Sequence, residues 1–121
     1  MLLDRIRKEI APATEIPKPA ARAPFRVKGE GMRRGERAII YTIPSHAATS
    51  RRHEKGITGS ELELAYAELV RSGSFTRDWF NEHLQACAKE GACNFTTIGG
   101  LLQLLGEAEY VERGTYRRIG G

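Results

Sequence analysis

Long apolar segments are missing from this chain of 121 residues, although apolar residues make up 40% and suffice for one small core. No window approaches the roughly 18 consecutive apolar residues that a helix needs to cross a bilayer. The first ten residues interrupt their apolar side chains with charges, unlike the apolar core of a secretory signal. The sequence therefore predicts a cytoplasmic protein with no membrane partner, and its length fits one modest domain.

Cysteine is also rare, and Cys87 and Cys93 are too few for the disulfide-dense scaffold of a small secreted domain. His83 lies four residues before Cys87, so these three side chains could converge on a zinc ion with His46 or His53 as the fourth ligand. The paired Cys-x-x-Cys spacing of many zinc sites is absent. We therefore predict no bound metal and treat both cysteines as packing residues.

Catalytic and cofactor-binding motifs are missing as well. The chain contains no phosphate loop of the form Gly-x-x-x-x-Gly-Lys-Ser/Thr, no Gly-x-Ser-x-Gly and no His-Glu-x-x-His. Glu61, Glu63 and Glu68 fall on one predicted helix, where acidic side chains usually face water. The sequence thus predicts a protein that is not an enzyme and holds no cofactor.

Proline, by contrast, is concentrated in residues 11–24, which hold four of the five prolines. Proline lacks a backbone donor and favours extended geometry, so this segment is predicted to be a linker or a strap. It follows apolar residues at helical spacing, Leu3, Ile6 and Ile10, in a piece too short to be a stable helix alone. We expect this terminus to dock on its own domain; the alternative is an arm for oligomerisation or partner binding.

The next segment, residues 25–57, is basic and β-like. Residues 38–43 are β-branched or aromatic and end at a proline, and with residues 25–29 they predict a hairpin or two short strands. Residues 45–56 have no apolar period and are predicted to form a surface loop. The basic side chains of the predicted turn and loop are Arg33, Arg34, Arg37, Arg51, Arg52 and Lys55.

Three helices and a hairpin are predicted in the second half. Thr58 and Glu61 have the spacing of a capping box, which starts a helix that Ser72-Gly73 ends. Thr76 can cap a second helix over residues 77–89. A third helix is expected over residues 95–106. Residues 108–119 then predict a hairpin that turns at Arg113-Gly114, with Glu109 roughly opposite Arg118.

This order of elements is similar to the winged-helix superfamily. The similarity is carried by Thr76 at the second helix, Phe95-Thr96-Thr97-Ile98 opening the third, and Leu104-Leu105-Gly106 leading into the hairpin. It implies an α+β fold with a three-helix winged-helix-like unit and a C-terminal β-hairpin, preceded by a small β-hairpin and the proline-rich segment. The predicted divisions are residues 1–24, 25–57 and 58–121, with 25–121 forming one compact domain.

The resemblance implies a small DNA-binding protein, such as a regulator, that uses the third helix and the hairpin. Residues 58–121, however, hold six basic and nine acidic residues, whereas residues 1–57 hold thirteen and six. Because phosphate neutralisation supplies most non-specific affinity, the basic segments of the first half are expected to supply the attraction. The predicted contacts are Arg33, Arg34, Arg51, Arg52, Lys55, Thr96, Thr97, Gln103, Arg113 and Arg117.

A glycine pair inside the third helix suggests an alternative. Gly99 and Gly100 destabilise a helix by about 1 kcal/mol each relative to alanine, so they indicate the close approach of another backbone there. That neighbour is either DNA or protein. The alternative hypothesis is therefore a protein-interaction module, a homodimer being one version, that docks through this helix surface and does not bind nucleic acid.

Overall fold

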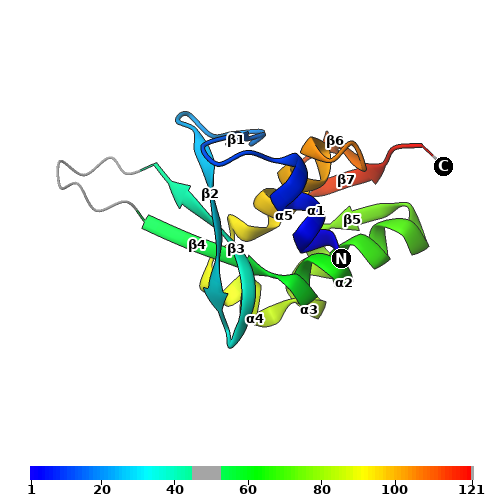
Figure 1. Ribbon diagram of the computed structural model, residues 1–121. Coiled ribbons are helices and arrows are strands. Elements are labelled where there is room, and N and C mark those ends of the chain that lie inside the picture. Colours follow the sequence, from blue (N-terminus) through cyan, green and yellow to red (C-terminus); the bar gives the residue numbers. More distant parts are fainter. Residues whose placement is uncertain (45–52, 121) are drawn as a thin grey trace.

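The computed structural model describes residues 1–44 and 53–120, which form five helices and seven strands (Figure 1). The strands make two antiparallel sheets with the orders β1-β2-β3-β4 and β5-β7-β6. The helices are α1 Leu2–Glu9, α2 Gly59–Ser72, α3 Arg77–His83, α4 Gln85–Glu90 and α5 Asn94–Leu104. The strands are β1 Glu15–Ile16, β2 Phe25–Arg33, β3 Glu36–Ile43, β4 His53–Thr58, β5 Ser74–Thr76, β6 Ala108–Glu112 and β7 Thr115–Arg118.

The first sheet contains the predicted hairpin, since β2 and β3 pair across a tight turn that joins Arg33 to Glu36. The prediction of a loop over residues 45–56 was wrong from His53 onward. Residues 53–58 form β4, which pairs with β3 over its whole length. The first two residues of β4, His53 and Glu54, are polar and exposed to solvent. This part of the strand therefore lacks the apolar alternation from which a strand is predicted.

The helix starts of the second half follow the sequence signals. The Thr58 hydroxyl accepts the Glu61 N–H, the Glu61 carboxylate accepts the Thr58 N–H, and Gly73 ends α2 with a left-handed backbone. Thr76 caps α3 through the Trp79 N–H. The predicted helix over residues 77–89 is instead two short helices, because the chain leaves helical geometry at Leu84.

The predicted arrangement, a three-helix winged-helix-like unit with a C-terminal β-hairpin behind a small β-hairpin, was wrong, although the protein is α+β as expected. A four-stranded, curled antiparallel sheet leads the chain where a small hairpin was expected, and the described residues of the second half hold four helices and a three-stranded sheet. The additional strands β1, β4 and β5 have two to six residues each. Such short edge strands are stabilised by pairing with a long-range partner, which local sequence patterns do not reveal. In the hairpin, Glu109 lies opposite Arg117 and not Arg118.

One hydrophobic core joins both halves of the chain. Leu2, Leu3 and Ile6 of α1 are buried in it, so the N-terminal helix docks on its own chain, where the Leu2 N–H donates to the Glu63 carboxylate at 2.6 Å. A group of aromatic rings fills its centre, with Phe75 packed 4.9 Å from Phe95 between ring centroids. Within residues 1–44 and 53–120, no helix is long and apolar enough to cross a membrane.

Candidate nucleic-acid interface

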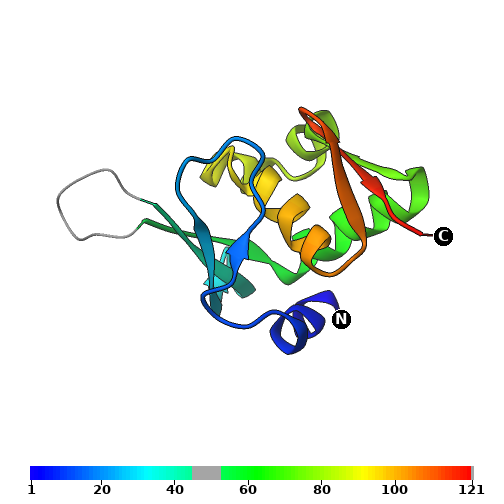
Figure 2. The same cartoon turned by 90° about the horizontal axis from the view of Figure 1, so that it is seen from above.

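Helix α5, the helix predicted to contact DNA, lies in the middle of the molecule (Figure 2). The face expected to be exposed is largely covered: Thr97 is fully buried, while Thr96 and Gln103 are only partly exposed. The hydroxyls of Thr96 and Thr97 both accept hydrogen bonds from Lys18, at 2.8 and 2.7 Å. In this conformation the two threonines contact the chain itself.

The glycine pair of α5 also faces its own chain. A Cβ atom at Gly99 would lie 2.1 Å from the ring of Tyr116, and one at Gly100 would lie 2.7 Å from the carbonyl oxygen of Pro17. The close neighbours predicted from the sequence are therefore strand β7 and the strap, by which we mean residues 11–24. The strap covers the helix surface that the protein-interaction alternative requires.

The predicted contacts in the first hairpin turn form a compensated ion-pair network. Arg34 contacts Glu61 at 2.7 Å and Glu90 at 3.0 Å, and Arg33 contacts Glu90 at 3.4 Å. Burial acts to raise the pKa of Glu90, but hydrogen bonds from Arg34 and Asn94 outweigh it and hold this pKa below its ordinary value. Hydrogen bonding to Glu61 raises the pKa of Arg34. Two guanidinium groups and two carboxylates thus neutralise one another.

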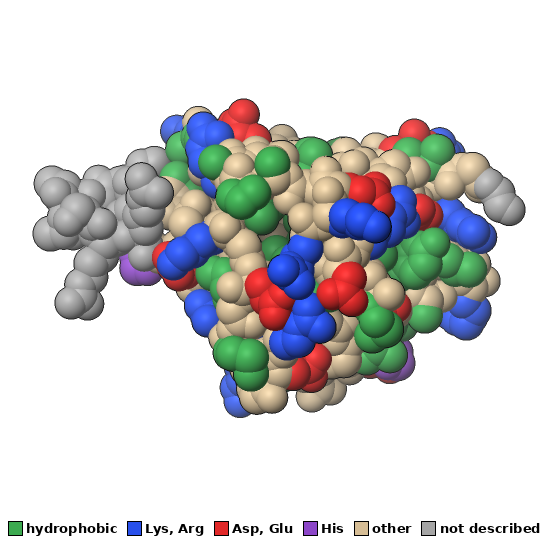
Figure 3. Space-filling model, in the orientation of Figure 1, with side chains coloured by type: hydrophobic (Ala, Val, Ile, Leu, Met, Phe, Trp, Pro, Cys, Tyr) green, Lys and Arg blue, Asp and Glu red, His purple; other side chains and the backbone are tan. Residues whose placement is uncertain are grey.

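The predicted contact Arg117 is also neutralised, because it forms an ion pair with Glu109. Arg37, another basic residue of the first hairpin, forms ion pairs with Glu30 and Asp4. Figure 3 shows basic and acidic side chains interleaved across the centre of one face, which therefore offers no uniform positive surface. Arg113 is exposed at the turn between β6 and β7. The predicted contacts Arg51 and Arg52 lie outside the described residues.

Three basic side chains from distant elements converge on the connection between α4 and α5. Each donates a hydrogen bond to one of its backbone carbonyls, and we call the three side chains the carbonyl-bound cluster. The bonds are Lys55 Nζ to Glu90 O (2.6 Å), Arg77 Nη1 to Ala92 O (3.1 Å) and Lys18 Nζ to Cys93 O (2.9 Å). A carbonyl carries only a partial negative charge, so these bonds position the cations without neutralising them.

Exposed basic residues border this cluster. The Arg77 N–H donates to the carbonyl of Gly114 at 3.0 Å, which holds Arg113 beside the start of α3. Arg22 on the strap and Lys89 on α4 are exposed as well. Figure 2 shows the strap, α4, the start of α3 and the β6–β7 turn along one edge of the molecule, opposite α1. We call this the basic edge, formed by Lys18, Arg22, Lys55, Arg77, Lys89 and Arg113.

The basic edge gathers most of the basic residues that no carboxylate pairs with. Within the described ranges, none of its six members forms an ion pair with a carboxylate, and of the other eleven basic residues eight do and three, Lys8, Arg26 and Arg118, do not. Asp78 and Glu112 follow Arg77 and precede Arg113 in the chain, yet neither pairs with its neighbour. The edge therefore concentrates positive charge that intramolecular contacts leave uncompensated.

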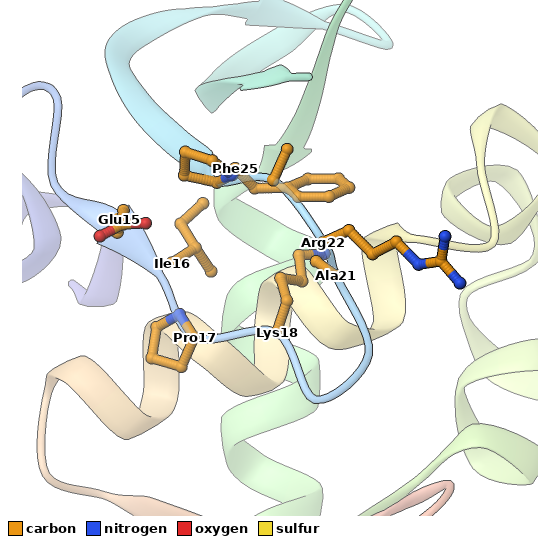
Figure 4. Close-up of a pocket in the computed structure, with 9 residues that line it drawn as sticks. Glu15, Ile16, Pro17, Lys18, Ala21, Arg22 and Phe25 are labelled. Atoms are coloured by element: carbon orange, nitrogen blue, oxygen red, sulfur yellow. The ribbon is translucent and has the colours of Figure 1, made fainter. Parts of the chain in front are cut away.

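Lys18 is the most buried member of the basic edge. Figure 4 shows it on the inner side of the strap, with Arg22 pointing away from the pocket. Its ammonium lies 4.3 Å from the ring centroid of Phe25 and 5.6 Å from that of Tyr41. Burial, with a smaller contribution from the charge of Arg77 and against an opposing effect of Cys93, lowers the pKa of Lys18 to about 7.

The residues considered as zinc ligands do not converge. His83 stacks on Trp79 with ring centroids 5.1 Å apart, Cys87 is buried, and the Cys93 sulfur lies 3.2 Å from the Tyr41 hydroxyl. In the described part of the chain, no group of three or more His, Cys, Asp or Glu side chains is arranged to hold a metal ion. His53 lies at the start of β4, and His46 falls outside the described residues.

Sequence reasoning singled out Lys55 and Arg113 at the basic edge but missed Lys18, Arg22, Arg77 and Lys89. No local signal marks these four, since they belong to the strap and to two helices that meet only in the fold. Comparison of the chain with protein-family models, with curated proteins and with solved structures finds no match.

Proposed function

We propose that this protein binds nucleic acid, DNA in the first instance, through the phosphate backbone at the basic edge. The observation that carries the proposal is the convergence of six basic side chains from the strap, β4, α3, α4 and the β6–β7 turn without a carboxylate partner among the described residues. The proposal retains the cytoplasmic location and the regulatory role expected from the sequence.

The chemistry of the edge favours phosphate over base contacts. Arg22, Lys89 and Arg113 are exposed, and guanidinium and ammonium groups suit phosphate oxygens. The threonines that could contact base edges are held by Lys18. We therefore expect binding with little sequence preference and strong dependence on salt, because phosphate contacts release condensed counterions.

Fluorescence anisotropy with a labelled duplex and a labelled single strand tests this proposal. Replacing Arg22 and Arg113 by glutamine is expected to weaken binding about tenfold at low salt and to reduce the slope of log affinity against log salt by about 0.9 per lost phosphate contact. Neither side chain supports the fold through an ion pair in the described ranges. This double variant should therefore unfold at the wild-type temperature.

Arg71→Gln is the matched control. Arg71 is an exposed arginine on the last turn of α2 that pairs with Glu68, so its loss removes one charge away from the basic edge. It should leave the salt slope unchanged. The proposal is contradicted if the protein binds neither the duplex nor the single strand, or if its affinity does not change with salt concentration. An equal loss in Arg71→Gln and in the double variant would assign the effect to net charge alone.

The protein-interaction alternative stays a prediction, as does a homodimer. Its proposed surface, Gly99 and Gly100 of α5, lies beneath Tyr116 and the strap. Sedimentation velocity over a range of protein concentrations measures self-association directly, independently of any nucleic acid.

A further inference from the structure

Helix α2 has apolar side chains on two sides. Leu62, Ala65 and Leu69 are fully buried in the core, as expected for an amphipathic helix. The outward side also carries apolar residues, and Leu64 and Val70 are 52% and 39% exposed. Figure 3 shows hydrophobic side chains on the surface over α2. Apolar residues on the solvent side of a helix indicate a surface that another element can cover.

The outward side of α2 has the spacing of a helix-pairing seam. Ser60, Leu64, Ala67 and Arg71 are all exposed and are separated by four, three and four residues. Residues with this alternating spacing fall on one line along a helix, which lets two helices pack side by side. The two central residues of this line are apolar and the two outer ones are polar. The line therefore has the composition of one short helix–helix contact.

A groove of about 680 Å³ lies beside the start of α2. Its lining includes the apolar side chains of Met1 and Leu3 from α1 and of Leu64 from α2. Met1 is 82% exposed, so much of this apolar surface is open to water. The groove borders α1, which lies opposite the basic edge (Figure 2). A partner bound in the groove therefore leaves the basic edge free.

Two carboxylates that line the groove have no cationic partner in the described part of the chain. Glu36 accepts hydrogen bonds from the N–H and the hydroxyl of Ser60 at 3.0 and 2.8 Å, and Glu63 accepts the Leu2 N–H at 2.6 Å. These neutral donors position both carboxylates without compensating their charge. Arg37, which also lines the groove, is paired with other carboxylates. The groove therefore fits a partner that brings an apolar side chain and a cation.

The other end of α2 carries the matching groups. Arg71 on the last turn has a side chain that is 72% exposed, although it contacts Glu68 at 2.8 Å, and the exposed Val70 precedes it. The apolar groove and its carboxylates thus lie at one end of the helix, and an apolar side chain followed by a cation lies at the other. A helix surface with complementary ends can pair with a copy of itself in the antiparallel direction.

We propose that two copies of this chain associate through α2, and not through α5, with the two α2 helices packed antiparallel about a two-fold axis. The axis lies at the midpoint of Gly59–Ser72 and sets Leu64 opposite Ala67 of the second copy. The same symmetry brings Arg71 of each copy to the start of the other helix, where Glu36 is held. Each groove thereby receives a cation from the other copy. The dimer does not depend on the proposed nucleic-acid binding.

Sedimentation velocity over protein concentrations from about 5 to 500 µM tests the pairing, and the wild type should change from monomer to dimer over this range. Leu64→Gln keeps the net charge and replaces an exposed side chain with another that favours helix. It should weaken association about hundredfold, tenfold for each copy of the residue. Met32→Gln is the matched control, because Met32 is 59% exposed on β2, and it should associate like the wild type.

A charge exchange tests the antiparallel arrangement. In Arg71→Glu two carboxylates would face each other at both ends of the dimer, and in Glu36→Arg two guanidinium groups would. Each variant alone should therefore associate at least about tenfold more weakly than the wild type. In an equimolar mixture, both contacts of a mixed dimer again join a guanidinium to a carboxylate. With one variant fluorescently labelled, sedimentation should show a mixed dimer about as tight as the wild-type dimer.

Three results would overturn the dimer. A wild type that stays monomeric at the highest concentration would leave the groove to a different partner. A dimer that Leu64→Gln does not weaken would use another surface. A mixture of the two charge variants that associates no better than either alone would contradict the antiparallel arrangement.

Nucleic-acid binding is judged separately. Leu64→Gln removes the pairing without changing the net charge, so its anisotropy titration distinguishes loss of pairing from loss of charge in Arg71→Gln. Failure to bind nucleic acid with intact self-association would reject the proposed function and leave the dimer in place. Salt-dependent binding by a protein that stays monomeric would reject the dimer alone.

Discussion

Replacing Arg34 by methionine should reduce the free energy of unfolding by about 3 kcal/mol, the lower end of the typical cost of removing one partner from a buried ion pair, because this network is partly buried. The guanidinium contacts Glu61, Glu90 and the carbonyl of Gly56. Glu61 is only 8% exposed and also belongs to the capping box of α2. Without Arg34 its charge would be desolvated and unpaired, and three acceptors would lose their donor. Urea denaturation monitored by circular dichroism measures the loss.

Arg37→Met provides the comparison within the same turn. The Arg37 side chain is 50% exposed and its carboxylate partners are at the surface, so this variant should lose no more than about 1 kcal/mol. Similar losses in the two variants would contradict the structural role assigned to the network of Arg33, Arg34, Glu61 and Glu90.

The loss of unfolding free energy in Arg34→Met should also depend on pH. The pKa of Glu90 is lowered in the folded protein, so its ionised form contributes stability above its ordinary pKa of 4.5, and this contribution is lost as pH falls through the folded value. The difference in unfolding free energy between wild type and Arg34→Met should therefore be full at pH 6 to 7 and shrink below about pH 4.5. A difference that stays constant down to pH 3 would show that the pair is not electrostatic in origin.

Adding one methyl group at Gly99 should have the other large effect. The new Cβ would lie 2.1 Å from Cζ of Tyr116, a ring that is fully buried among Phe75, Phe95 and Tyr110. Overpacking of a core typically costs about 1–3 kcal/mol, and a contact with a confined ring falls at the upper end. The helix propensity of alanine offsets up to about 1 kcal/mol, which leaves a net loss of about 2 kcal/mol for Gly99→Ala.

Gly59→Ala is the matched control, since Gly59 also lies in a helix. There the new Cβ would meet its nearest neighbours at 3.8 Å, an ordinary contact, so the variant should be as stable as the wild type or gain up to about 1 kcal/mol. Thermal unfolding of both variants tests the difference. A stable Gly99→Ala would indicate that α5 and β7 do not approach each other as described.

Local chemistry in the sequence determined the boundaries of several elements. Thr58, Glu61 and Thr76 satisfy free N–H groups within three residues along the chain, and Gly73 adopts a left-handed backbone at the end of its own helix. The β-branched run of β3 and the turn at Arg113-Gly114 act over similarly short distances. These features were predictable because both interacting groups lie in one short segment.

Tertiary structure decided which basic side chains are left without a carboxylate partner and which face of α5 is covered. The sequence showed that Arg34, Arg77 and Lys18 are basic, but their partners lie between 15 and 79 residues away. Only the fold pairs Arg34 with Glu61 and directs Arg77 and Lys18 to uncharged carbonyls. The same holds for α5: its glycines indicated a close neighbour, and the neighbours, Tyr116 and Pro17, come from opposite ends of the chain. Neighbouring residues in the sequence determine where a helix starts and which side chains carry charge. Burial and charge compensation depend on contacts made between distant segments.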